Sequence, residues 1–323
     1  MHSIADKNMP LMPRLYLLLL LCLCWIPLPV LALDNITLLV GTPSLPSNEF
    51  VEQFKTEIAQ GNDSKPAVNV IRVEELVNKH AALSDNTIII AVGVQALYQA
   101  SKLDNRLPVL GVLVSQPAFD KLQQDSKRNT RNFSAIVLDQ PIPRQIALIK
   151  ALMPSATHIG ILLGPLSRPL GSVLQQAASQ QGFGLLQENI RDPDDLVPML
   201  KHVLSSSPVL LAVPDPIVYN RETVQTILLT SYRYQKPVIG FSQAYVRAGA
   251  LAAVFSTPGQ VAKQAAEVVR QFAGKPQGGL PPPLIPKYFS VETNRQVARS
   301  LGIELGDENA LSETLLRIER PLP

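Results

Sequence analysis

The stretch Thr87-Ile-Ile-Ile-Ala-Val92, which stops at Gly93, decides how this chain folds. Short runs of Val, Ile and Leu without polar alternation are typical of strands buried on both faces of a parallel sheet. In such sheets, ligands bind beyond the carboxyl ends of the strands, so the residues that end the runs are candidates for a binding site. Four further runs of this kind occur, at Pro108–Val114, Ile159–Leu163, Val209–Val213 and Val238–Phe241.

Strand-like and helix-like segments alternate from Ile36 onward, which indicates an α/β fold with parallel sheets. The chain is longer than a typical single domain, so two domains are expected. Asp139-Gln-Pro-Ile-Pro143 contains two prolines that stiffen an extended connection, and it is predicted to cross between the two halves. The segment Thr257-Pro258 predicts a helix start, because Thr is a good cap and Pro is tolerated in the first turn.

The N-terminal 32 residues have the three parts of a secretory signal. Lys7 and Arg14 give a positive start, 15–25 is almost wholly apolar, and Val30-Leu-Ala32 places small residues before a cleavage site. We therefore expect a cleaved signal peptide over 1–32 and a periplasmic mature protein. An uncleaved membrane anchor is the alternative, because the apolar character continues to Leu33.

Bulk composition narrows the classes of partner. The formal net charge is +3 at pH 7, which predicts neither a nucleic-acid nor a membrane-surface partner. The two cysteines, Cys22 and Cys24, lie inside the predicted signal, so no disulfide is expected in the mature chain.

Sequence signatures of catalysis are missing. His80, His158 and His202 have no Cys, His or carboxylate at metal-ligand spacing. The sequence contains no nucleophile elbow, no Walker loop and no dinucleotide-binding glycine motif. No catalytic residue, metal or cofactor is therefore predicted.

Hydrogen-bonding side chains follow the predicted strands and form the candidate ligand site. Asp215 stands out because Pro214 and Pro216 fix its backbone, so that its carboxylate could pair with a ligand ammonium or hydroxyl. Each of these residues could equally be an ordinary cap or turn former. The candidates are Thr42, Ser44, Gln95, Ser115, Gln116, Asp139, Ser167, Asp215, Tyr219 and Ser242.

Several segments resemble the periplasmic substrate-binding components of ABC transporters, in particular a group that includes binders of aromatic amino acids. The resemblance covers nearly the whole mature chain and is carried by Pro143–Pro154, His158–Leu163, Lys236–Gly240, Arg247–Leu251, Phe289–Asn294 and Ala298–Gly302. The sequence departs from the family pattern at Asn132-Phe-Ser-Ala135, which continues to Leu138-Asp139, and at Phe255-Ser-Thr-Pro258, and both stretches are expected near the cleft.

The resemblance implies the type I periplasmic binding protein fold, with two doubly wound Rossmann-like lobes joined by a three-crossing hinge. Lobe I would comprise 33–140 plus 243–276 and lobe II 141–242 plus 281–305, followed by a poorly ordered tail over 306–323. Asp215 matches a position at which the family commonly carries an Asp that faces the cleft.

The implied function is that of an exported solute-binding protein that captures a small ligand, such as an amino acid or similar polar metabolite, and delivers it to an ABC permease. A monomer is expected. Three alternatives are left open: a ligand sensor that docks on a membrane receptor or kinase and uses the same cleft, a secreted enzyme, and a transcriptional regulator, since such proteins share the fold. The predicted signal and the lack of an N-terminal helix-turn-helix argue against the regulator.

Overall fold

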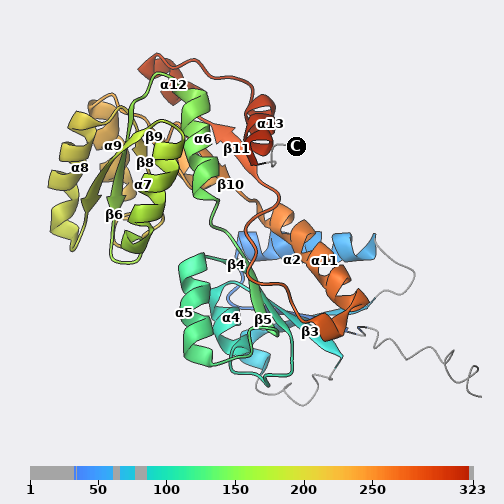
Figure 1. Ribbon diagram of the computed structural model, residues 1–323. Helices are drawn as coiled ribbons and strands as arrows, with labels where there is room; N and C mark the ends of the chain where they lie inside the picture. Colours follow the sequence, from blue (N-terminus) through green and yellow to red (C-terminus); the bar gives the residue numbers. More distant parts are fainter. Residues whose placement is uncertain (1–32, 34, 61–65, 77–85, 320–323) are drawn as a thin grey trace, which may run out of the picture.

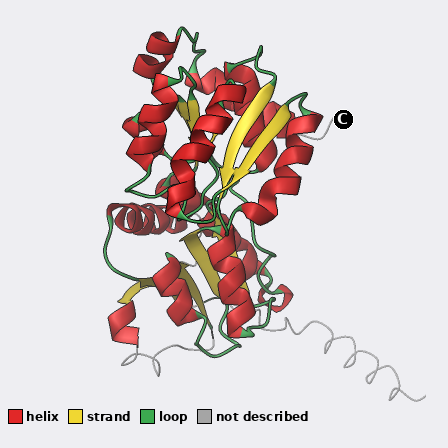
Figure 2. Cartoon of the chain, turned by 90° about the vertical axis from the view of Figure 1, so that its left-hand side faces the viewer, coloured by secondary structure: helices red, strands yellow, loops and turns green. Residues whose placement is uncertain are grey.

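The computed structural model describes residues 33, 35–60, 66–76 and 86–319, so the predicted signal peptide lies outside the described residues. Two sheets form two lobes, each covered by helices on both faces (Figure 1). Turned by 90°, the molecule again shows the two sheets in separate lobes, with helices flanking them (Figure 2). The α/β, two-lobe architecture predicted from the sequence is confirmed.

Lobe I contains a five-stranded parallel sheet in the order β2-β1-β3-β4-β5. Every residue of β3 is buried, as its continuous apolar run predicts. Each fully buried Ile or Leu contributes roughly 1.5–3 kcal/mol to folding. The elements are β1 (Asn35–Val40), α2 (Leu45–Ala59), β2 (Ala67–Arg72), η1 (Val73–Glu75), β3 (Thr87–Val92), α4 (Val94–Ala100), β4 (Val109–Val114), α5 (Gln116–Ser126) and β5 (Phe133–Val137).

Lobe II contains a six-stranded sheet in the order β11-β10-β9-β8-β6-β7, in which only β11 is antiparallel to its neighbour. Its elements up to β9 are α6 (Ile142–Leu152), β6 (His158–Leu163), η3 (Arg168–Leu170), α7 (Gly171–Gln180), β7 (Gly184–Asn189), η4 (Pro193–Asp195), α8 (Leu196–Ser206), β8 (Leu210–Leu211), α9 (Val224–Arg233) and β9 (Val238–Gly240). The C-terminal elements, of which α11 and η5 lie in lobe I, are α10 (Gln243–Ala248), β10 (Ala252–Phe255), α11 (Pro258–Gly274), η5 (Pro276–Gly278), β11 (Ser290–Thr293), α12 (Arg295–Leu301) and α13 (Glu308–Glu319).

The chain passes between the lobes three times. The first crossing follows β5 at 138–141, the second joins β10 to α11 at Ser256 and Thr257, and the third runs from Ile285 to Phe289. Thr257 caps α11 together with Gln260, as its sequence predicts, and α11 packs against α2 of lobe I. The hinge therefore consists of three short segments from distant parts of the sequence.

Two domain boundaries predicted from the sequence are wrong. β10 pairs with β9, so 243–255 belongs to lobe II and only α11 returns to lobe I. In addition, Leu284 exchanges backbone hydrogen bonds with Ala135 and Val137, which places 281–285 beside β5 in lobe I. These positions depend on which strands pair with one another, and hydrophobic runs alone do not show strand pairing.

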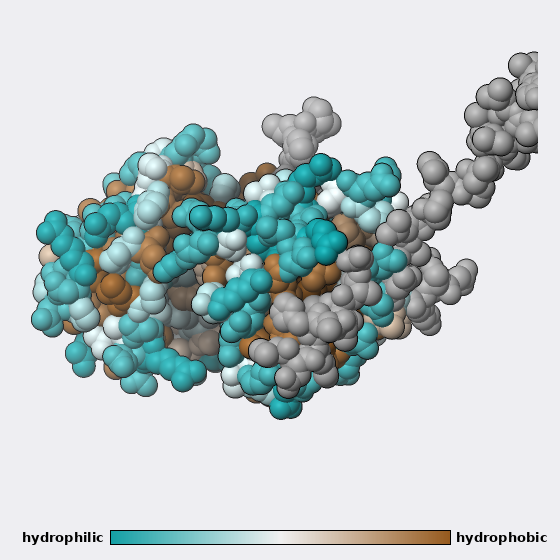
Figure 3. Space-filling view, turned by 90° about the horizontal axis from the view of Figure 1, so that it is seen from below, coloured by the Kyte–Doolittle hydropathy of each residue, from teal (hydrophilic) through white to brown (hydrophobic). Residues whose placement is uncertain are grey.

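The expected poorly ordered tail is also wrong. The segment over 308–319 forms α13, and Leu311 and Leu315 are buried in the core of lobe II against α6. Glu308 anchors the start of this helix by accepting hydrogen bonds from the backbone and hydroxyl of Thr293, both at 2.7 Å. Seen from below, polar side chains lie across much of the surface with apolar ones scattered between them (Figure 3).

Candidate functional site

A cavity of about 770 Å³ lies between the lobes, at the carboxyl ends of β1 and β3 on one side and of β9 and β10 on the other. Residues from both lobes and from the first and second crossings line it. They are Gly41, Thr42, Ser44, Pro46, Ser47, Glu49, Val92, Gly93, Val94, Gln95, Leu113, Leu138, Phe241, Ser242, Gln243, Ala244, Phe255, Ser256, Thr257 and Pro258. This volume is the size of a small-molecule site.

The lobe I wall is built by the loop after β1 and the start of α4. The side-chain oxygen of Gln95 accepts hydrogen bonds from the backbone N–H and the hydroxyl of Thr42, at 3.2 and 3.4 Å. A Cβ at Gly41 would lie 2.6 Å from that oxygen, so a larger residue there would displace the end of the Gln95 side chain. Gly93, with φ of +85°, turns the chain into α4 and completes the wall.

The lobe II wall is aromatic. The ring of Phe241 lies 4.6 Å from that of Tyr245 and 6.1 Å from that of Tyr219, and both tyrosines are buried behind it. Burial raises the pKa of both tyrosines well above the usual value, so they stay neutral. Ser242 caps α10 by accepting from the backbone N–H of Tyr245.

Charge is sparse in the cavity. Among its lining residues, all in the described part of the chain, Glu49 carries the only ionisable side chain. Apolar lining residues remain open to solvent, with Val94 47% and Leu138 37% exposed. The cavity therefore combines a few hydrogen-bonding groups with apolar surface that a ligand can cover.

Four of the ten predicted site residues line this cavity: Thr42, Ser44, Gln95 and Ser242. Gln243, Ser256 and Thr257 also line the cavity but are not among the ten candidates, although Phe255–Pro258 is expected near the cleft. Ser256 directly follows the strand-like run that becomes β10, so the rule about residues that end a run would have found it.

Three predicted residues lie at the same edge of lobe I but outside the cavity. Ser115 caps α5 by accepting from the backbone N–H of Ala118. The backbone N–H of Gln116 donates to the Asp139 carboxylate at 2.6 Å, and burial raises the pKa of Asp139. These groups hold the start of α5 against the end of β5.

Asp215, the strongest sequence candidate, is 4% exposed and lies outside the cavity, which corrects its expected position on the cleft surface. Its Oδ2 accepts from the backbone N–H groups of Leu166 and Ser167 and from the Ser167 hydroxyl, at 3.1, 2.9 and 3.0 Å. Its Oδ1 accepts from the backbone N–H of Ile217 at 3.0 Å. The carboxylate thus joins the loops after β6 and β8. Ser167 belongs to this connection between the two loops and lies outside the cavity. Tyr219 is buried in the core of lobe II.

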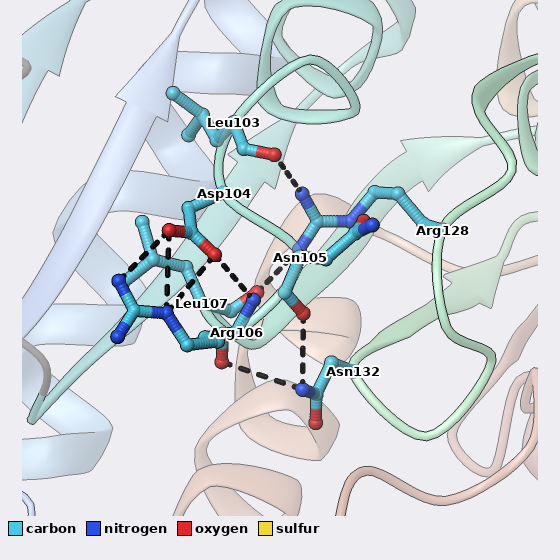
Figure 4. Close-up of polar contacts among 7 residues, drawn as sticks. All are labelled: Leu103, Asp104, Asn105, Arg106, Leu107, Arg128 and Asn132. Carbon is cyan, nitrogen blue, oxygen red and sulfur yellow. Dashed lines mark hydrogen bonds and ion pairs between the residues drawn. The ribbon is translucent and has the colours of Figure 1, made fainter.

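A second hollow, of about 730 Å³, lies at the base of lobe I between the C-terminal ends of α4 and α5. Its charged neighbours are used internally (Figure 4). Buried Arg128 donates to the carbonyls of Leu103 and Leu107, and the guanidinium of Arg106 lowers the pKa of Asp104 to about 2. Asn132 donates to the carbonyls of Asn105 and Arg106.

Asn132 therefore lies at the base of lobe I, because β5 begins at that end of the sheet, so the expected position near the cleft is wrong for the start of this stretch. Leu138, which follows the end of β5, does line the cavity. The other departure from the family pattern, Phe255–Pro258, does line the cavity.

Within residues 33, 35–60, 66–76 and 86–319, no group of three or more His, Cys, Asp or Glu side chains is placed to hold a metal ion. No helix in those ranges has the length and apolar character needed to cross a membrane.

Two lobes, three crossings and a cavity between the strand ends define a two-lobe α/β binding protein. The family model described as ABC transporter substrate binding protein matches residues 49–314. The chain belongs to this family, a class of proteins that bind solutes. No curated protein matches the sequence.

Solved structures share the fold at low identity. An ABC domain from Streptococcus pneumonia in complex with L-Trp is 16% identical with a TM-score of 0.58, covering 87% of this chain and 98% of that one. A ligand-free, open substrate-binding protein with adhesive properties from Clostridium difficile is 15% identical, with a TM-score of 0.69 and coverage of 85% and 96%. A substrate-binding protein from Desulfitobacterium hafniense in complex with Leu is 11% identical, with a TM-score of 0.57 and coverage of 81% and 98%.

Proposed function

We propose that this protein is exported, captures a small polar or amphipathic ligand in the cavity between its lobes, and delivers it to an ABC permease. The single observation that carries the proposal is the 770 Å³ cavity, whose walls come from both lobes and from a crossing. A ligand held by groups on both sides favours approach of the lobes, because its contacts to both are complete only when they close.

The proposed ligand is an amino acid or a similar small metabolite. The cavity offers hydroxyl and amide groups together with the apolar surfaces of Phe241, Val94 and Leu138. Relatives in complex with L-Trp and Leu support this size and character. Binding is proposed to occur without turnover, since the family is a solute-binding class and the lining residues include no His, Cys or Lys.

The test is a thermal-shift screen of the mature chain, from residue 33 onward, against amino acids, nucleosides, monosaccharides and short peptides. A compound that binds only the folded state, at a free concentration of about a hundred times its Kd, adds about 2.7 kcal/mol to the free energy of unfolding. This stabilisation raises the Tm. A raised Tm for one chemical class, followed by copurification with a membrane permease, supports transport. No shift across the whole panel contradicts the proposal, and copurification with a receptor or kinase in place of a permease indicates a sensor.

A further inference from the structure

The second crossing contains a hydroxyl that belongs both to the cavity and to the hinge. Ser256 lines the cavity, and its side chain also bonds to the other two crossings. The Ser256 hydroxyl donates to the backbone carbonyl of Tyr288 in the third crossing at 2.6 Å. It accepts from the side-chain amide of Gln140 in the first crossing at 3.0 Å.

Gln140 is itself held in place from several sides. It is 7% exposed, and its side-chain oxygen accepts from the guanidinium of Arg144 at 2.6 Å. Its backbone carbonyl accepts from the side chain of Gln145 at 2.9 Å. Because linked hydrogen bonds polarise one another, a change at Ser256 alters the strength of the other hydrogen bonds in this chain of groups.

Arg144 extends the network back to the third crossing. It is 3% exposed, donates to the carbonyl of Pro286 at 3.1 Å, and its guanidinium lies 4.0 Å from the ring centroid of Phe289. The three crossings are thus joined by side chains around Ser256, which is the member of this network that lines the cavity.

Hydrogen-bond capacity tells which ligand group Ser256 can receive. A serine hydroxyl has one donor and two acceptor positions. Tyr288 takes the donor and Gln140 takes one acceptor position, which leaves one acceptor position. A ligand N–H or O–H can bind there without breaking either bond, whereas a carboxylate or phosphate oxygen would have to displace the Tyr288 carbonyl.

We propose that Ser256 contacts the ligand directly, selects a ligand that presents an N–H or O–H donor at this point, and couples ligand binding to movement of the hinge. This inference rests on the proposed function, because it concerns the same cavity. The coupling is local, because the hydroxyl that receives the ligand also bonds to both the first and the third crossing.

The test uses the mature chain with Lys121→Cys on α5 and Lys201→Cys on α8, both exposed and on different lobes. These are the only cysteines after residue 32, so spin labels attach at two defined places. Pulsed electron–electron double resonance then gives the distribution of distances between the two labels, and so between the lobes. Ser256→Ala is compared with Ser256→Thr, which keeps the hydroxyl, and with Ser101→Ala, which removes a serine-to-carbonyl bond inside lobe I.

Without ligand, Ser256→Ala is expected to broaden the distance distribution, while Ser256→Thr and Ser101→Ala match the wild type. The panel compound that binds the wild type most tightly is expected to bind Ser256→Ala about tenfold more weakly, a loss of about 1.4 kcal/mol. A derivative methylated until no N–H or O–H remains on that group lacks the donor, and it should lose affinity for the wild type but lose little more on Ser256→Ala.

An unchanged distance distribution and unchanged affinity in Ser256→Ala would overturn the inference while leaving the proposed function intact. Equal binding of the donor-bearing compound and its methylated derivative to the wild type would overturn the selection of a donor. Failure of every panel compound to bind the wild type contradicts the proposed function itself.

Discussion

The loop around Asp215 and the crossing around Ser256 contrast in how they use their polar groups. Asp215 sits between prolines after a strand, and its oxygens receive four hydrogen bonds from the protein. Ser256 is an ordinary residue in the sequence, yet it lines the cavity and joins the crossings. A conspicuous carboxylate can serve the architecture, whereas ligand contacts come from groups whose bonding capacity is not exhausted.

The largest expected effect comes from removing the carboxylate of Asp215. Asp215→Ala leaves the donors of Leu166, Ser167 and Ile217 without their acceptor and should lower the free energy of unfolding by about 2–4 kcal/mol. Urea denaturation measures the change, with Asp192→Ala as the control at an exposed η4 cap. Wild-type stability together with lost ligand binding would instead show that Asp215 contacts the ligand.

A smaller loss of stability is expected on substitution of Gln264, whose side chain bonds the third crossing to α11. This side chain is 6% exposed, donates to the carbonyl of Ile285 at 3.0 Å and accepts from the backbone N–H of Lys287 at 2.8 Å. Gln264→Ala should cost about 1–2 kcal/mol in the free energy of unfolding. Gln175→Ala, at an exposed glutamine that bonds only Ser179, should change it by less than about 0.5 kcal/mol, and equal effects would contradict the role of Gln264.

At the lobe I wall, stability and binding should separate. Gln95 is exposed, so Gln95→Ala should change the free energy of unfolding by less than about 0.5 kcal/mol. The affinity for the ligand found in the screen should fall about tenfold, because Gln95 lines the cavity. Calorimetric titration and urea denaturation of the same sample measure both quantities. Unchanged affinity would show that Gln95 makes no contact that matters for ligand binding.

The smallest effect is a pH dependence at Asp139. Burial raises the pKa of this carboxyl above its usual 3.8, so the folded chain keeps the proton at a pH where the unfolded chain has lost it. The contribution of Asp139 to stability therefore falls as pH rises from below 3.8 through the raised folded pKa. Asp139→Asn should be more stable than the wild type at pH 7, with the difference vanishing below 3.8. A difference that grows on acidification would contradict this sign.

The sequence predicts the buried strands well, because a short continuous run of Val, Ile and Leu that ends at a turn residue is typical of few structures other than a buried strand. β3 begins and ends as predicted, and β6 comprises the predicted run Ile159–Leu163 with His158 before it. β8 is reduced to Leu210–Leu211 beside the loop that Asp215 fixes. Topology is harder, since the assignment of β10 to lobe II depends on its pairing with β9. The amphipathic spacing of Leu311 and Leu315 was the overlooked signal for α13.

The candidate site was predictable where a strand end alone determines the position, as at Thr42 and Gln95. It was not predictable where internal partners decide the role. Nothing local to Pro214-Asp-Pro216 shows that Ser167 reaches its carboxylate, and nothing local to Ser256 shows that Gln140 and Tyr288 meet there.

We expect the cavity, and not the Asp215 loop, to hold the ligand. The most direct measurement is a side-by-side calorimetric titration of Gln95→Ala and the nearly isosteric Asp215→Asn with the ligand that most raises the Tm of the wild type. Gln95→Ala is expected to lose about tenfold in affinity, whereas folded Asp215→Asn should keep a Kd within about twofold of wild type. Full affinity in Gln95→Ala with binding lost in folded Asp215→Asn would contradict it.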